Sequence, residues 1–220
     1  MKKFAVIVAA GSGTRMHSAI PKQFMELKGR PVLWYTMSAF LKAYEDLQII
    51  LVLPQAYTEH GSEIIAATRA QHRIQITTGG ETRFHSVKNG LQLVEANSIV
   101  FVHDAARCLV STELIHRCYE HALKYGNAIP AINATDTIRI DKGHGPVLVD
   151  RNQVYIIQTP QTFRADVLKP AFDQPYNQSF TDEASVAEAA GARIQLIKGE
   201  PDNIKITNPL DLTIAASLLK

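Results

Sequence analysis

The chain has 220 residues, enough to bury the core of one full domain, so we expect a single domain over residues 1–220. Its 23 lysines and arginines stand against 21 aspartates and glutamates, a balance that disfavours proteins that coat nucleic acid or bind membranes through a polybasic surface. No apolar run approaches the roughly 20 residues that cross a bilayer, and the N-terminus leads directly into a predicted strand, so we expect neither a membrane span nor a signal peptide.

The periodicity of apolar residues predicts strands that alternate with helices in the first half of the chain. The predicted strands are 4–9, 48–53, 73–77 and 99–103; the predicted helices begin after Pro31, cover much of 58–70, contain Val87, Leu91 and Val94, and cover 111–125. This alternation indicates the α/β class, with a doubly wound, mostly parallel Rossmann-like sheet. In such a sheet, ligands bind beyond the carboxyl ends of the strands.

The alternation breaks after residue 125. A strand is predicted at 127–132, and then a strand, a glycine-rich turn and a strand at 136–140, 141–145 and 146–149. We therefore expect a β-hairpin arm, inserted at about 133–153, and because an isolated hairpin buries little surface, we expect it to pack on a second subunit of a homodimer. The remaining predicted elements are strands at 154–158 and 193–198, helices at 166–172 and 181–190, and a last helix that begins at Asn208-Pro209.

The two cysteines, Cys108 and Cys118, lack the spacing of a zinc site or a redox motif. We expect them to be reduced thiols, which are typical of a cytoplasmic protein. A structural zinc site is not expected.

A glycine-rich loop, Ala10-Gly11-Ser12-Gly13-Thr14-Arg15, follows the first predicted strand, and Pro21-Lys22-Gln23-Phe24 comes shortly after it. Small residues let backbone N–H groups approach an anion closely, and Arg15 and Lys22 add two positive charges, so the loop predicts a phosphate site. The spacing of a Walker loop is missing, and Met16 stands where the dinucleotide fingerprint needs a third small residue. The alternative interpretation is a tight turn with two surface cations.

Two further polar clusters, at 79–83 and 103–107, also follow predicted strands. Because the carboxyl ends of parallel strands meet at one edge of a sheet, we expect the three clusters to form one site.

Nine short strings follow one another in order along the chain: AAGSGTRM, PKQF, GGETRFHSV, HDAARCLV, DTIR, DRN, TPQTF, TDEAS and NIKIT. With them the sequence resembles the nucleotidyltransferases that join a nucleotide to a phosphorylated sugar or polyol. Among these it is most similar to the 2-C-methyl-D-erythritol 4-phosphate cytidylyltransferase family of the non-mevalonate isoprenoid pathway. The resemblance implies the nucleotide-diphospho-sugar transferase type of fold and transfer of CMP from CTP to the polyol phosphate, with release of pyrophosphate.

The resemblance also implies the residues that bind the nucleotide. They are expected in the three clusters: Ala9, Ala10, Gly11, Ser12, Gly13, Gly80, Glu81, Ser86, Asp104 and Ala105. Arg15 and Lys22 would stabilise the charge of the transition state, because phosphoryl chemistry depends chiefly on positioning and electrostatics. Gly80 would leave space for the pyrimidine, with Ser86 and Glu81 as polar contacts; alternatively, Ser86 is a surface residue at the start of a helix.

Asp104 is the candidate metal ligand, because Mg²⁺ prefers one or two carboxylates together with phosphate oxygens. A ribose contact or a helix cap is the alternative. We expect His103 to be a packed strand-end histidine and not a general base, since an attacking phosphate is already deprotonated.

For the second substrate the resemblance implies a set that contains Asp104 and six other residues: Arg107, Thr137, Arg151, Thr159, Thr181 and Lys205. Arg151 and Lys205 would hold the phosphate for in-line attack, and the arm would carry Thr137 and Arg151 into the partner's site. Two alternative functions stay open: a cytidylyltransferase for ribitol 5-phosphate, and a non-catalytic nucleotide-binding protein.

Overall fold

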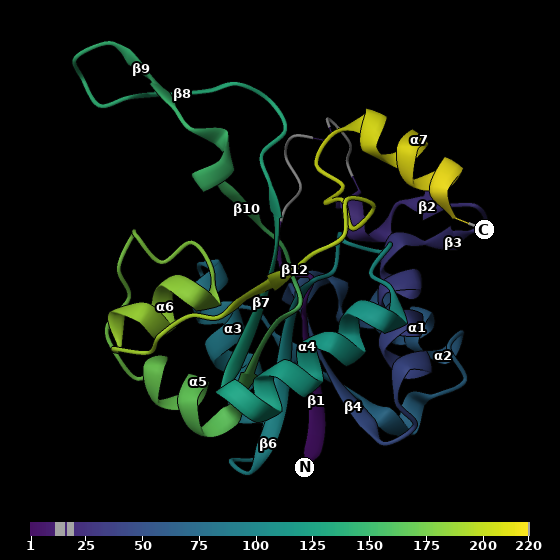
Figure 1. The fold of residues 1–220 in the computed structure, drawn as a ribbon. Coiled ribbons are helices and arrows are strands. Elements are labelled where there is room, and N and C mark those ends of the chain that lie inside the picture. The colour runs from purple at the N-terminus through teal and green to yellow at the C-terminus, as the bar shows by residue number, and fades with distance from the viewer. Residues whose placement is uncertain (12–15, 17–19, 220) are drawn as a thin grey trace.

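The computed structural model describes residues 1–11, 16 and 20–219, and within them one eight-stranded sheet forms the centre of the molecule (Figure 1). The strand order is β10-β7-β11-β6-β1-β4-β5, and β12 pairs with β7. The strands of this sheet are β1 (Lys2–Val8), β4 (Leu47–Leu53), β5 (Ile74–Thr78), β6 (Ser98–Asp104), β7 (Asn127–Asn133), β10 (Tyr155–Ile157), β11 (Gln161–Arg164) and β12 (Leu196–Lys198).

The predicted mostly parallel sheet is confirmed. β1 pairs in parallel with β4 and β6, and β4 pairs in parallel with β5. Two strands run antiparallel to their neighbours: β10 pairs with β7, and β11, which the sequence did not predict, lies between β6 and β7. With only four residues, two of them the buried polar Gln161 and Thr162, β11 carries no apolar period that marks a strand.

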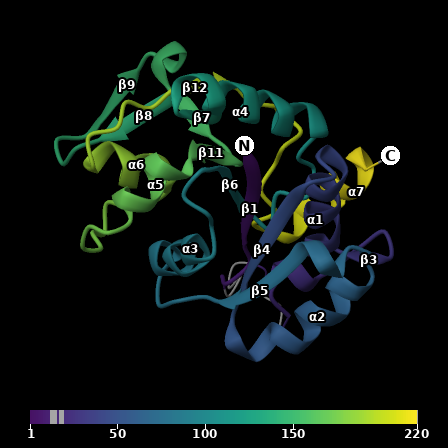
Figure 2. The same cartoon turned by 90° about the horizontal axis from the view of Figure 1, so that it is seen from below.

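Helices cover both faces of the sheet (Figure 2), and the two faces have separate cores. The apolar run in β1 explains this: Ala5 and Ile7 belong to one core, and Phe4 and Val6 belong to the other, as the alternation of a strand requires. The helices are α1 (Val32–Ala43), α2 (Thr58–Ala66), α3 (Arg83–Gln92), α4 (Thr112–Tyr125), α5 (Ala165–Ala171), α6 (Glu183–Ala189) and α7 (Pro209–Leu218). Among the described residues, no helix is long and apolar enough to cross a membrane.

Most predicted boundaries agree with the structure to within two residues. α2 covers much of 58–70, as predicted, whereas β12 begins at Leu196 and not at 193. The start of α7 is confirmed in detail: the Asn208 side chain caps the helix, Pro209 is its first residue, and Asp211 completes a capping box. Cys108 and Cys118 are buried free thiols.

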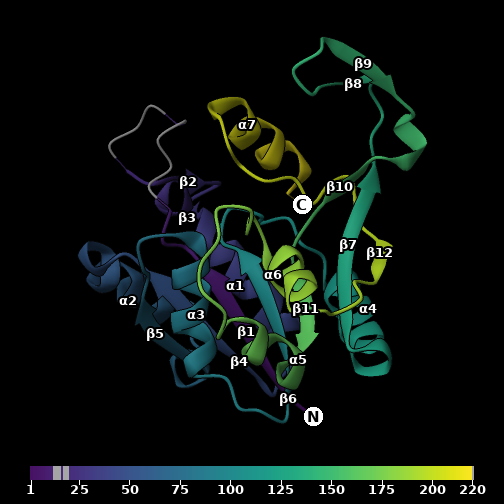
Figure 3. The same ribbon diagram turned by 90° about the vertical axis from the view of Figure 1, so that its left-hand side faces the viewer.

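The predicted hairpin is confirmed as β8 (Ile138–Asp141) paired antiparallel with β9 (Pro146–Val149). It extends away from the body of the molecule (Figures 1 and 3). Its turn contains Gly143 and Gly145, whose φ angles of 92° and 91° favour glycine. Val147 and Leu148 of this arm are 66% and 61% exposed, so the hairpin shows apolar side chains to solvent.

Short 3₁₀ helices and a second small sheet complete the described structure. The 3₁₀ helices are η2 (Lys22–Phe24), η3 (Gln55–Tyr57), η4 (Gln71–Arg73) and η5 (Arg151–Gln153), and the small sheet pairs β2 (Glu26–Leu27) with β3 (Arg30–Pro31).

At Gly90, helix α3 packs closely on the sheet. A Cβ at this position would lie 2.6 Å from Cγ1 of Val6 and 3.1 Å from Cγ2 of Val52, both buried and stiff at χ1. We expect Gly90→Ala to lower the free energy of unfolding by about 1–3 kcal/mol, because overpacking outweighs the gain in helix propensity of about 1 kcal/mol. Urea unfolding measures this, with Gln92→Ala at the exposed end of α3 as the control. An unchanged or higher stability would contradict this packing.

Candidate active site

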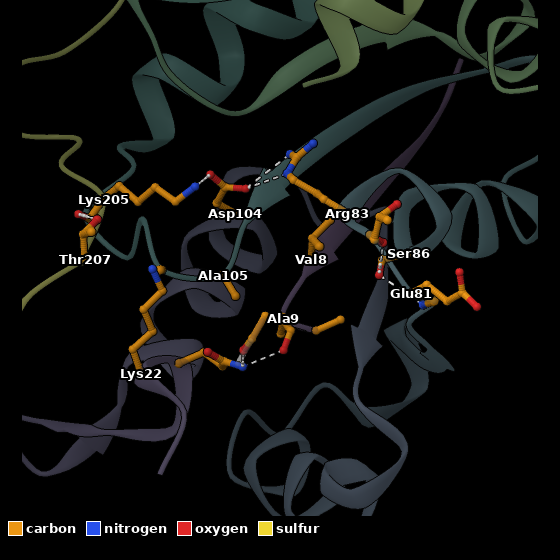
Figure 4. Close-up of a pocket in the computed structure, with 16 residues that line it drawn as sticks. Val8, Ala9, Lys22, Glu81, Arg83, Ser86, Asp104, Ala105, Lys205 and Thr207 are labelled. Atoms are coloured by element: carbon orange, nitrogen blue, oxygen red, sulfur yellow. Dashed lines mark hydrogen bonds and ion pairs between the residues drawn. The ribbon is translucent and has the colours of Figure 1, made fainter. Parts of the chain in front are cut away.

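A cavity of about 540 Å³ lies beyond the carboxyl ends of β1 and β6. Its walls come from the glycine loop, the start of α3, the end of β6 and the segment before α7 (Figure 4). The lining residues are Val8, Ala9, Ala10, Gly11, Lys22, Gln23, Gly80, Glu81, Thr82, Arg83, Ser86, Asp104, Ala105, Ala106, Lys205 and Thr207. The three polar clusters of the sequence therefore do meet in one pocket.

The Gln23 side chain fixes the described part of the glycine loop. Its Nε2 donates to the carbonyl oxygen of Ala9 at 2.6 Å and to that of Gly11 at 3.1 Å, and the side chain is almost completely buried. In a trans peptide the N–H points opposite to the C=O, so the N–H of Ala10 points away from Gln23. Ser12, Gly13 and Arg15 lie outside the described residues, so their predicted roles stay predictions.

Lys22 begins η2 and lines the pocket. Its Nζ donates to the carbonyl oxygen of Ile206 at 2.7 Å, a contact that links the loop after β1 to the segment before α7. Lys205, next to Ile206 in the sequence, also lines the pocket. The structure thus brings together the two lysines that the sequence assigned to different substrates.

Ser86 is buried in the pocket wall, so the alternative of a surface helix residue is wrong. Its hydroxyl donates to the carbonyl oxygen of Thr82 at 2.9 Å and accepts from the N–H of Gly80 at 3.1 Å. Glycine at position 80 has a packing reason as well, because a Cβ there would lie 2.5 Å from Cβ of His85. Contact of Ser86, Gly80 and Glu81 with a base stays a prediction.

Asp104 is the last residue of β6, and its carboxylate contacts several of the charged side chains at the pocket. Oδ2 lies 2.8 Å from Nζ of Lys205, and Oδ1 accepts from Nε and Nη2 of Arg83 at 3.3 and 3.2 Å. In Figure 4 the two cations approach the carboxylate from opposite sides. Burial alone would raise the pKa of Asp104, but the charges of Arg83 and Lys205 outweigh it and hold this pKa far below its usual range.

His103 is fully buried, as predicted, and lies behind Asp104. Its Nε2 donates to the carbonyl oxygen of Arg107 at 3.0 Å, so in the neutral ring Nδ1 accepts from the Thr159 hydroxyl at 3.0 Å. The N–H of Asp104 in turn donates to that hydroxyl at 3.1 Å. Burial lowers the pKa of His103 to about 4. His103 therefore supports Asp104 from behind and does not line the pocket.

The residues predicted for the second substrate fall into two groups. Arg107 and Thr159 pack around Asp104, and the Arg107 guanidinium donates to the carbonyl oxygens of Asn203 and Ile157 at 2.8 and 3.4 Å. Thr137, Arg151 and Thr181 are exposed and do not line the pocket of the described chain. Nη1 of Arg151 donates to the carbonyl oxygen of Thr135 at 2.8 Å. The roles of all five stay predictions.

Sequence reasoning missed Arg83, Glu183 and Gln23. Arg83 and Glu183 stand in the strings GGETRFHSV and TDEAS, but nothing in their spacing shows that they pair, because 100 residues separate them. Gln23 stands in PKQF, and its contact with the glycine loop had no signal beyond that proximity.

Asp104 stays the candidate magnesium ligand. It offers a carboxylate at the pocket, which is the ligand type that Mg²⁺ takes together with substrate phosphates. The described residues contain no group of three histidine, cysteine, aspartate or glutamate side chains that could hold a metal. Both oxygens of Asp104 contact cations in this structure, Oδ1 with Arg83 and Oδ2 with Lys205, so magnesium binding at Asp104 stays a prediction.

Comparison with known proteins places the chain beside cytidylyltransferases. The family model for 2-C-methyl-D-erythritol 4-phosphate cytidylyltransferase matches residues 4–220. The enzyme of that name from Bacteroides fragilis is 45% identical over 219 residues, with 100% of both chains covered. The crystal structure of the enzyme from Francisella tularensis is similar with a TM-score of 0.81 and 31% identity, again over 100% of both chains.

The buried neutral His103 predicts a pH dependence of stability. Its pKa of about 4 in the folded chain lies below the value of about 6.5 in an unfolded chain, so the unfolded state binds more protons between these values. Stability should therefore fall as pH drops from about 6.5 to 4, by up to about 3 kcal/mol from this one residue.

His103→Gln keeps a donor and an acceptor but cannot be protonated, so it should lose less stability over the same interval. Urea unfolding of both proteins at pH 7 and pH 4.5 measures the difference. Equal losses in the two proteins would show that His103 is not the source.

Proposed function

This chain belongs to the 2-C-methyl-D-erythritol 4-phosphate cytidylyltransferase family, and from that premise we propose how its pocket carries out the reaction. The enzyme transfers a cytidylyl group from CTP to 2-C-methyl-D-erythritol 4-phosphate, giving 4-diphosphocytidyl-2-C-methyl-D-erythritol and pyrophosphate. The observation that carries the mechanism is one pocket that contains a glycine loop, two lysines and a paired carboxylate.

In the proposed reaction an oxygen of the polyol phosphate attacks the α-phosphorus of CTP. The bond between that phosphorus and the bridging oxygen breaks, and pyrophosphate leaves with its electron pair. Both reactants are anions, so the chief contribution of the protein is to hold them together and to stabilise the charge of the transition state. Lys22 and Arg15 supply positive charge on the nucleotide side, and the backbone of Ala10, Gly11 and Gly13 contacts the phosphates.

We propose that Lys205 and Asp104 prepare the other side of the pocket. The ammonium of Lys205 lies 2.8 Å from the Asp104 carboxylate, where it can meet the phosphate of the polyol. Arg107 and Thr159 hold this pair in place from behind. No general base is needed, because the attacking phosphate is already deprotonated at neutral pH.

Magnesium is proposed as the cofactor. Asp104 and the phosphates of CTP would hold it, and when bound the ion neutralises charge on the phosphates.

The base of CTP would lie against Gly80, Glu81, Ser86 and Ala105, which line the pocket beside the glycine loop. A cytoplasmic location is proposed on the two buried free thiols.

We propose that the enzyme is a homodimer through its arm. Five apolar side chains on β8, β9 and β10 are 43–66% exposed, and such surfaces mark interaction sites: Ile140, Val147, Leu148, Tyr155 and Ile156. A two-stranded hairpin alone is marginally stable in water, so a partner subunit would stabilise it. Docking would also bring Thr137 and Arg151 to the partner's pocket, which neither residue lines in a single chain.

Pyrophosphate release tests the function directly. Purified protein with CTP and 2-C-methyl-D-erythritol 4-phosphate should turn over, and ribitol 5-phosphate in parallel identifies the closest alternative. ATP and GTP should be poor substrates in a site built for a pyrimidine. Binding of CTP without turnover of either polyol phosphate would support a non-catalytic protein instead.

Lys22→Ala should lower kcat much more than it raises the KM for CTP. Loss of one donor that acts on the transition state typically costs about 2.7–4 kcal/mol, which is about 10²–10³ in kcat. Steady-state kinetics measure this, with Lys42→Ala on the exposed surface of α1 as the control. An unchanged kcat with a raised KM would make Lys22 a ground-state anchor only.

Subunit mixing tests whether the arm acts in the partner's pocket. Lys22→Ala and Arg151→Ala should each have little activity, but a mixed dimer would have one site with both defects and one site with none. Random exchange makes half of the dimers mixed, so about a quarter of the wild-type activity should return. No recovery in a mixture shown to contain mixed dimers would rule out the shared site.

A further inference from the structure

The inference concerns Glu183, a carboxylate with no exposed surface at the first residue of α6. Burial of a charge is costly unless a partner of opposite sign meets it with good geometry. Arg83 is that partner: its Nη1 and Nη2 contact Oε1 and Oε2 of Glu183, and the second of these distances is 3.0 Å. Burial raises the pKa of Glu183, and the charge of Arg83 opposes this effect.

The other edge of the same guanidinium faces the pocket. Nε and Nη2 of Arg83 contact Oδ1 of Asp104 at 3.3 and 3.2 Å, and Oδ2 of Asp104 is left to Lys205 at 2.8 Å. Glu183 does not line the pocket, whereas Arg83 and Asp104 do. A continuous series of ion pairs therefore joins the buried Glu183 to Lys205 in the pocket. Arg83 and Asp104 lie between them.

The planar guanidinium is what makes this arrangement possible. Its nitrogens are fixed in one plane, so it can bind two carboxylates along two edges at once, which a lysine ammonium cannot do with the same geometry. With Glu183 on one edge, the rotation of Arg83 is fixed, and with it the position of Oδ1 of Asp104. The remaining oxygen then points to Lys205.

We infer that Arg83 and Glu183 are positioning residues that orient the Asp104 carboxylate toward Lys205, and that they act on the polyol phosphate through this pair. The inference rests on the proposed function, because turnover is its readout. If wild-type protein has no turnover, the proposed function fails; if it turns over and the experiment below fails, only this inference does.

Glu183→Gln is the first variant, because it keeps the shape and removes the charge. It should lower kcat/KM for the polyol phosphate about tenfold, within the range of coupling seen for residues in one network. Glu188→Gln makes the same chemical change at an exposed position of α6 and should have no effect. Equal activity of Glu183→Gln and wild type would overturn the inference.

A double-mutant cycle separates positioning from general loss of structure. In a Lys205→Ala background, Glu183→Gln should lower the residual kcat/KM less than about twofold, because the group that it positions is gone. An equal tenfold loss in both backgrounds would mean that the two residues act independently, and would overturn the inference.

Arg83→Lys supplies a second route if Glu183→Gln does not fold. It keeps the positive charge and loses the second edge, so the same cycle with Lys205→Ala should again be non-additive. If thermal melts show that Glu183→Gln and Arg83→Lys both destroy the fold, then the pair is a structural element, and the positioning role is overturned.

Discussion

The negative charge of Asp104 persists in a buried position only because cations from separate parts of the chain surround it. Arg83 comes from the start of α3 and Lys205 from the segment before α7, while Asp104 itself ends a central strand. Removal of one partner would leave a buried charge with less compensation, which is far more costly than a lost surface pair. These ion pairs thus link Asp104, at the end of β6, to Arg83, about 20 residues earlier in the sequence, and to Lys205, about 100 residues later.

The fold could be predicted wherever the pattern of apolar residues in the sequence matches the pattern of buried residues in the structure. β1, β4 and β6 are buried on both faces, so their apolar runs stand out, and α7 begins at a cap and a proline that are visible in the sequence. β11 could not be predicted, because a four-residue strand with two buried polar side chains is defined by its neighbours β6 and β7. This pairing depends on the tertiary structure and leaves no signal in the local sequence.

The location of the site could also be predicted, since parallel strands bring their carboxyl ends to one edge. The partners within it could not. Asp104 was identified as a functional carboxylate. Its contacts with Arg83 and Lys205 join segments that are far apart in the sequence, so no local pattern predicts them. Thr137 and Arg151 lie on the arm and do not line the pocket of the described chain, so their predicted roles stay predictions.

The Gln23 amide has a consequence for the binding of the proposed phosphate ligand. Because the carbonyl oxygens of Ala9 and Gly11 already accept hydrogen bonds from Gln23, these carbonyl groups are held in place before any ligand binds. Fixing a residue's backbone costs roughly 1–2 kcal/mol of conformational entropy, and here that cost is met during folding and not during binding. Gln23 therefore preorganises the described part of the glycine loop, so that binding of the proposed phosphate ligand should need less rearrangement there.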